Sequence, residues 1–149
     1  MTTPTRVCLW FESGAEEAAK CYQTLFPDAR ITHIQPKFDN PAEALVVSFE
    51  LGGQKFSLLN GGPYYTLSPA TSIEVRLDTQ ADIDRVWATL SEGGTEMQCG
   101  WLTDRWGVSW QIVPTVFFDL IAGPKAGAVM EAMMSMVKFD IAALKAAAT

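Results

Sequence analysis

The side chains best able to do chemistry in this chain are few. Cys8, Cys21 and Cys99 form no CxxC pair, and their odd number argues against a disulfide framework or a zinc knuckle. The single histidine, His33, lies near no cysteine motif and falls on a predicted strand, where a structural role is commoner than metal ligation. No nucleophile can therefore be paired with a base, and the sequence assigns no catalytic residue.

Carboxylates and aromatic residues are the next candidates. Glu50, Glu74 and Asp104 would each serve as a base if desolvated, although exposed or ion-paired carboxylates are commoner. Glu74 has the parity of Ser72 on its strand, so we expect both on one face. Several aromatic residues could line an apolar pocket, and packing in the core would explain them equally well. They are Tyr64, Tyr65, Trp101, Trp106 and Trp110.

Composition excludes several classes of protein. With 149 residues, 48% of them hydrophobic and 19% charged, the chain is long and apolar enough to form one globular domain without a disulfide or a structural metal. A net charge of -6 and the lack of any Lys/Arg cluster argue against nucleic acid as a partner. No apolar run reaches the roughly 18 residues of a membrane span, and the first residues lack a signal-peptide core, so we expect a cytoplasmic protein.

The first half of the chain has the pattern β-α-β-β-β. An apolar run at 6–11 precedes a helical stripe that ends at Pro27, and Ser13 with Glu16 fits a capping box at the helix start. Gly52-Gly53 predicts a tight hairpin turn between two of the strands that follow. Those strands are expected at about 29–36, 44–51 and 54–60.

The second half repeats this order. A strand at 71–77 leads to Thr79 as N-cap of a second helix, which ends at Gly93-Gly94. Strands at 98–104 and 107–113 then form a hairpin closed by a turn from Asp104 to Gly107. The shift of 65 residues that superposes Tyr22 on Trp87 also carries Val7 to Ser72, which favours an internal duplication.

Residues 115–149 form a tail outside both halves. Apolar positions at helical spacing predict two or three helices there. The spacing of Met130, Met133, Met134 and Val137 is more typical of a core or a subunit interface than of a ligand surface.

Several long motifs resemble the PhnB-like branch of the vicinal oxygen chelate superfamily. They are LWFESGAEEAAKCYQTLFPDARI, LNGGP at 59–63, QCGWLTDRWGVSWQIVP at 98–114 and MEAMMSMVKFDIAALKAA. The resemblance implies an α+β fold of two βαβββ modules around a cavity, over one domain with modules at about 5–62 and 70–114 and a helical tail at 115–149. It also implies a homodimer, with which the Met-rich tail agrees.

Superfamily enzymes hold a divalent metal in that cavity, and the resemblance places Val7, Ser72 and Gln111 at the ligand positions. Valine has no donor atom, a protonated serine is a poor ligand, and a glutamine amide lacks the charge of the usual carboxylate. We therefore expect no metal and no other cofactor. Similar proteins are often labelled 3-demethylubiquinone-9 3-methyltransferase, yet no glycine-rich turn here leads from a strand into a helix, as a Rossmann-like nucleotide site requires.

Strand parity then predicts which side chains line the cavity. If Gln111 faces it, Trp110 packs outward against a helix, and a one-residue slip would invert every assignment. The predicted ligand-binding residues are Val7, Leu9, Phe11, Asn60, Ser72, Glu74, Trp101 and Gln111. Such a lining suits an uncharged or weakly polar small molecule. The alternatives are a metal-dependent lyase, isomerase or transferase, the methyltransferase of the label, or a structural module whose cavity is filled.

Overall fold

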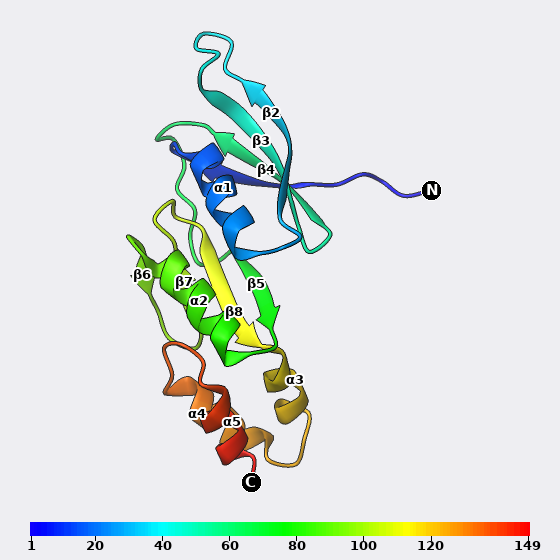
Figure 1. Cartoon of the computed structure of the whole chain (residues 1–149), viewed down its shortest axis with the longest axis vertical. Coiled ribbons are helices and arrows are strands. Elements are labelled where there is room, and N and C mark those ends of the chain that lie inside the picture. Colours follow the sequence, from blue (N-terminus) through cyan, green and yellow to red (C-terminus); the bar gives the residue numbers. More distant parts are fainter. The chain divides into compact units, whose positions relative to one another are not determined.

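The computed structural model describes all 149 residues and divides them into two compact units (Figure 1). Unit 1 comprises Met1–Leu67, and unit 2 comprises Ser68–Thr149. Each unit contains a four-stranded mixed sheet with one long helix after its first strand, and three further helices follow in unit 2. The predicted α+β fold of two βαβββ modules with a helical tail is therefore confirmed. None of the helices has the length and apolar character needed to cross a membrane.

Unit 1 joins a parallel strand pair to an antiparallel hairpin. Its elements are β1 (Val7–Phe11), α1 (Ala15–Leu25), β2 (Arg30–Pro36), β3 (Ala44–Leu51) and β4 (Gln54–Asn60). The strand order is β1-β4-β3-β2, with only β1 and β4 parallel. Gly52 and Gly53 connect β3 to β4 with φ of 58° and 80°, the left-handed pair that a two-residue hairpin requires.

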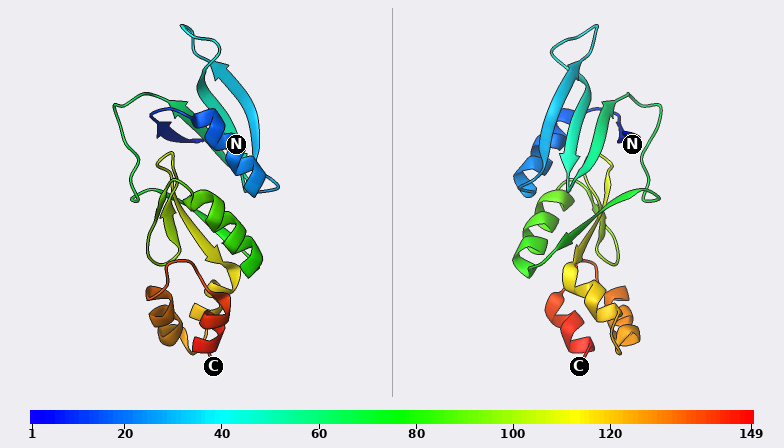
Figure 2. Two further views of the ribbon diagram at one scale, coloured as in Figure 1. Left: turned by 60° about the vertical axis from the view of Figure 1, so that its left-hand side comes forward. Right: turned by 90° about the vertical axis from the view of Figure 1, so that its right-hand side faces the viewer.

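Helix α1 covers one face of the unit 1 sheet (Figure 2). The fully buried Tyr22 ring of α1 lies 5.8 Å from the ring of Phe49 on β3, which is paired with Phe56 on β4. Phe56 is in register with Val7, and Leu58 is in register with Leu9. Residues in register share a face, so the helix-facing side chains of β1, β3 and β4 form one apolar layer.

The start of α1 differs from the predicted capping box. Gly14 is the N-cap, with φ of 81°, and neither Ser13 nor Glu16 closes the first turn. Instead the Ala15 N–H donates to Asn60 Oδ1 at 2.9 Å. The capping group therefore comes from β4, 45 residues away in sequence, and local spacing could not reveal it.

Unit 2 repeats the arrangement with shorter outer strands. Its elements are β5 (Ser72–Leu77), α2 (Gln80–Ser91), β6 (Thr95–Glu96), β7 (Trp101–Thr103) and β8 (Ser109–Pro114). The strand order is β5-β8-β7-β6, with β5 and β8 parallel. The predicted N-cap is confirmed, because Thr79 Oγ1 accepts the Asp82 N–H at 3.1 Å. The two-residue strand β6 was not expected from the sequence.

Strand β7 starts later than predicted because the backbone before it is not extended. Cys99 has φ of 61° and Gly100 has φ of 80°. A Cβ on Gly100 would lie 2.3 Å from the Phe139 ring, so the tail packs directly against this glycine. The Cys99 and Gly100 N–H groups also donate to the carbonyls of Met136 and Val137, at 2.8 and 2.7 Å.

The tail is an integral part of unit 2. It consists of α3 (Thr115–Ile121), α4 (Ala126–Met134) and α5 (Ile141–Ala147), in agreement with the predicted helices. Phe117, Val129, Phe139 and Leu144 form a buried cluster with Val113 at the end of β8. Met133 packs against this cluster, whereas Met134 remains 67% exposed.

A buried carboxylate organises the β7–β8 hairpin. Asp104 is only 3% exposed, and its Oδ1 accepts the N–H groups of Trp106 and Val108, both at 3.0 Å. Its Oδ2 accepts the indole N–H of the fully buried Trp110 at 2.9 Å. The Gly107 N–H donates to the Asp104 carbonyl, so the predicted turn is confirmed. The carboxylate serves the fold, and not a reaction.

We expect Asp104→Asn to lower the free energy of unfolding by about 3 kcal/mol. Either orientation of the amide would direct its NH₂ group at a donor, namely the indole or the backbone N–H groups. Urea unfolding measures the effect. In a Trp110→Phe background the indole donor is gone, so the cost of Asp104→Asn should fall by at least about 1 kcal/mol. Equal costs in both backgrounds would contradict this assignment.

Candidate functional site

The face of each sheet opposite its helix is here called the open face. In unit 2 the open face carries a pair of polar side chains at its centre. Gln111 Nε2 on β8 donates to Ser72 Oγ on β5 at 2.9 Å. Register places Glu74 and Trp101 on either side of Gln111. The structure thus brings together four of the predicted site residues.

The face assignment of β8 agrees with the predicted alternation. Trp110 and Ile112 are fully buried on the side that α2 covers, together with Leu102 of β7. Gln111 is only partly buried and lies on the other side. The expectation that Trp110 packs against the helix layer and Gln111 does not is therefore confirmed.

The unit 2 open face offers hydrogen bonds but no base. Gln111 uses its NH₂ group on Ser72, which leaves its carbonyl oxygen as an acceptor. The Glu74 carboxylate is paired with Arg76 at 3.0 Å, and the Arg76 guanidinium lies 3.7 Å from the centre of the Phe118 ring. An exposed carboxylate that is already ion-paired lacks the desolvated setting of a catalytic base. The arrangement can bind a polar group of a small molecule.

The predicted facing of the β1 side chains, by contrast, is wrong. Val7, Leu9 and Phe11 were expected to face the cavity, but Leu9 and Phe11 are 4% and 0% exposed and lie on the face that α1 covers. The side chains of β1 on the open face are Cys8 and Trp10. Half of the apolar lining predicted for the ligand is therefore core.

A difference in loop length explains this error. Three residues separate β1 from α1, but only Asp78 and Thr79 separate β5 from α2. The helices correspond at an offset of 65 residues, whereas the helix-facing side chains of the strands correspond at 66, with Leu9 matching Val75. A one-residue slip moves every side chain of a strand to the other face.

Asn60, another predicted ligand-binding residue, has its side chain engaged in the fold. Its Oδ1 caps α1 through Ala15, and its Nδ2 donates to the Ala44 carbonyl at 2.9 Å. It is in register with Phe11 and so lies on the helix-covered face. The structure separates Asn60 from the open-face residues.

Three rows of side chains cross the open face of unit 1, because the register aligns neighbouring strands. The middle row is polar and consists of Cys8, Ser57, Ser48 and His33. The row on one side is charged and consists of Lys55, Glu50 and Arg30, with Arg6 at its β1 end. The row on the other side is mainly apolar and consists of Trp10, Leu59, Val46 and Gln35. Most of these residues were missed from the sequence, and the unequal loops were the signal that would have found them.

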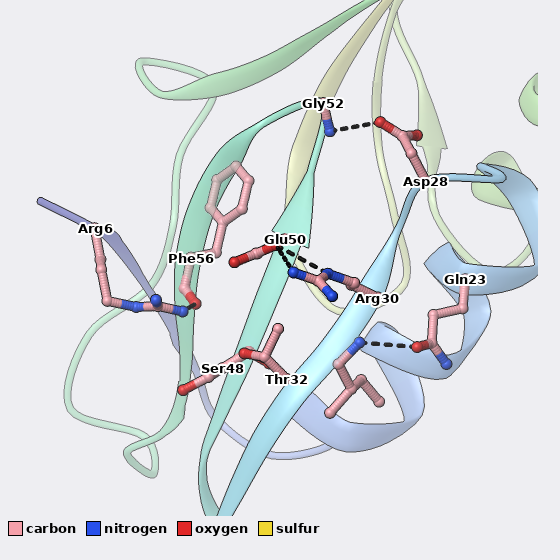
Figure 3. A network of polar contacts seen from close by, with 10 residues as sticks. Arg6, Gln23, Asp28, Arg30, Thr32, Ser48, Glu50, Gly52 and Phe56 are labelled. Carbon is pink, nitrogen blue, oxygen red and sulfur yellow. Dashed lines mark hydrogen bonds and ion pairs between the residues drawn. The ribbon is translucent and has the colours of Figure 1, made fainter.

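Electrostatics in the charged row centre on Glu50. Arg30 Nε and Nη2 both donate to one oxygen of Glu50, at 3.0 and 2.8 Å, while the second oxygen points away from Arg30 (Figure 3). The hydrogen bonds from Arg30 hold the pKa of the Glu50 carboxyl below its usual range, and the positive charges of Arg30, Lys55 and Arg6 act in the same direction. Glu50 is therefore ionised at neutral pH and belongs to the Arg30 ion pair.

The residues present do not fit the divalent metal that the superfamily implies. The chain contains no group of three or more His, Cys, Asp or Glu side chains placed to hold a metal ion. Val7 faces the helix, and Gln111 and Ser72 form a neutral pair, so neither open face presents a charged donor set. His33 is exposed, and all three cysteines are free.

The glycine pairs do not fit a nucleotide cofactor. Gly52-Gly53 turns β3 into β4, Gly61-Gly62 follows β4 and precedes a segment without helix, and Gly93-Gly94 follows α2. None of them leads from a strand into a helix N-terminus, which is the geometry that binds a nucleotide phosphate or a similar group.

Comparisons with known proteins support one family. A sequence model described as 3-demethylubiquinone-9 3-methyltransferase matches residues 4–113. The PhnB protein from Bacillus cereus is 30% identical and has a TM-score of 0.68, over 76% of this chain and 100% of that chain. No curated protein sequence matches the chain.

More distant structures share the fold alone. The fosfomycin resistance protein FosX from Mesorhizobium loti is 16% identical, with a TM-score of 0.57 over 83% of this chain and 99% of its own. A glyoxalase/bleomycin resistance protein from Albidiferax ferrireducens is 13% identical, with a TM-score of 0.50 over 76% of this chain and 98% of its own. The fold is thus that of the vicinal oxygen chelate superfamily. Within that superfamily, the chain belongs to the PhnB-like 3-demethylubiquinone-9 3-methyltransferase family.

We expect purified protein to contain well under one zinc, nickel or manganese ion per chain, because the aligned ligand positions lack charged donors. Elemental analysis by mass spectrometry after purification without chelators measures this. A stoichiometric metal that is lost in Gln111→Ala would contradict the expectation.

Proposed function

We propose that this PhnB-like protein binds a small organic molecule on the open faces of its sheets, without a metal or other cofactor. The observation that carries the proposal is the Gln111–Ser72 pair on the unit 2 open face, at 2.9 Å. Its geometry orients one unused amide oxygen and one hydroxyl beside the indole of Trp101. A few oriented polar groups next to an aromatic surface are typical of small-molecule sites.

Burial supports this assignment. Gln111, Ser72 and Trp101 are all partly exposed, so a ligand can reach them, whereas the other face of the sheet is closed by α2. Glu74 and its partner Arg76 stand at the margin and would contact a ligand as a neutralised pair. The methyltransferase rests on the description of the family model alone, and the residues on the open faces supply neither a nucleotide-binding turn nor a metal site to support it or a metal-dependent lyase.

We expect Gln111→Leu to weaken binding of a neutral ligand about tenfold, because one hydrogen bond is lost while the side-chain volume is kept. Native mass spectrometry of the protein as purified, followed by ligand-observed NMR with a library of small amides and alcohols, supplies the ligand and its affinity. Gln54→Leu at the exposed first residue of β4 is the matched control and should change nothing. If no library member shifts the Ser72, Trp101 or Gln111 signals, the proposal fails.

We also propose that the protein is a homodimer paired through its tail. Met130, Met134 and Val137 leave 39%, 67% and 37% of their surfaces exposed in the single chain. Large apolar side chains grouped in this way are typical of protein interfaces. A stable homodimer would bury roughly 2,000 Å² in total.

We expect light scattering to give twice the chain mass for the native protein and the single mass for Met134→Glu, because a charge would be buried in the interface. Ala128→Glu introduces the same charge at an exposed position on the same helix, about 120° away around its axis, and should remain dimeric. A native protein that is monomeric at every concentration would rule out the dimer.

A further inference from the structure

The open face of unit 1 carries positive charge on an acidic protein. The 67 residues of unit 1 include five Lys or Arg and seven Asp or Glu. Three of the five cations, Arg6, Arg30 and Lys55, lie along the charged row of the open face, and Glu50 is the one carboxylate among them. Such segregation on one face of an acidic unit indicates a binding role for the row.

Two of these cations have no carboxylate of their own. Glu50 accepts two hydrogen bonds from Arg30, one from Nε and one from Nη2. Lys55 lies directly across from Glu50 on β4 but forms no ion pair. Arg6 donates to the Ser57 hydroxyl at 3.1 Å and to the Phe56 carbonyl, both of which are neutral. The negative charge of Glu50 neutralises that of Arg30, so the net positive charge of the row comes from Lys55 and Arg6.

The row of positive charge is separated from an apolar row by hydroxyl groups. Along β4 the open-face side chains are Lys55, Ser57 and Leu59 in turn. Side chains two residues apart on a strand are about 6.7 Å apart, so Lys55 and Leu59 are separated by about 13 Å. The face thus changes from cationic to polar to apolar over the length of a small molecule.

The apolar end has a fixed aromatic wall. Trp10 is in register with Leu59, which is in register with Val46. The Trp10 indole donates to the Gly62 carbonyl at 2.9 Å, and its ring meets the Tyr65 ring edge to face at 4.9 Å. A held indole beside Leu59 and Val46 is suited to contact with a flat or linear apolar group.

From this juxtaposition we propose that the unit 1 open face binds an organic anion with an apolar body, its carboxylate or other acid group at Lys55 and Arg6 and its body on Trp10, Leu59 and Val46. This inference rests on the proposed small-molecule function and names the ligand class of a different face. For the unit 1 face it replaces the uncharged ligand expected from the sequence, because the apolar side chains of β1 on which that expectation depended lie under α1.

The test uses 2-naphthylacetate, which has an acid group and an apolar body of the right length, and its neutral primary amide. We expect the acid to bind the full-length protein at least about fivefold more tightly than the amide, as one favourable charge contact predicts. Lys55→Gln should remove this preference by weakening only the acid. Lys20→Gln, an exposed lysine on α1 with the same change in charge, should leave it intact.

The apolar body is tested separately with Val46→Thr, which keeps the shape and the branching at Cβ. It should weaken the acid and the amide by the same factor, about threefold. Amide NMR signals of Ser48, Ser57 and Leu59 report the location, and unchanged spectra of the free variants show that each is folded.

Several results would overturn the proposal. Equal affinities for acid and amide, an unaltered preference in Lys55→Gln, or failure of the acid to bind would each reject the anion site. Shifts confined to Ser72 and Gln111 would reject it while leaving the proposed function intact. The proposed function fails on a different result, namely the lack of any library ligand at Gln111.

Discussion

Burial of one sheet face under a single helix is the constraint on which both units depend. Strand side chains alternate between faces, so once Leu9, Phe49 and Leu58 pack under α1 the remaining side chains must form the open face. Each large side chain buried in this way contributes about 1.5–3 kcal/mol. A slip of one residue would expose that whole layer, and the register is therefore fixed by the core alone.

Two polar side chains, the partly buried Asn60 and the buried Asp104, fix local geometry that apolar packing does not specify. Asn60 joins the end of β4 to the start of α1, and Asp104 ties the β7–β8 turn to the indole of Trp110. Each satisfies N–H groups that would otherwise be buried without a partner, at a cost of about 1–3 kcal/mol apiece. Both polar side chains are thereby committed to the fold, which leaves the chemistry of the protein to its open faces.

The two open faces differ in what they can recognise. Unit 2 presents the neutral Gln111–Ser72 pair with a carboxylate already matched by Arg76, whereas unit 1 presents two unmatched cations beside hydroxyls and an aromatic wall. The two modules therefore share one fold but have open faces of different chemical character. Since the positions aligned with superfamily metal ligands hold no charged donors, family membership does not transfer metal chemistry to this chain.

The sequence by itself determined the elements other than β6, the duplication, the family and the face of β8, because each depends on local periodicity or on a long motif. It also located the Thr79 cap and the Asp104 turn, where donor and acceptor are at most four residues apart. Only the tertiary structure decided the face of β1 and the roles of Asn60 and Lys55. The face of β1 depends on a one-residue difference between two loops, which the 65-residue offset of the helices does not reveal. The roles of Asn60 and Lys55 depend on pairing between strands far apart in sequence, which local periodicity does not specify.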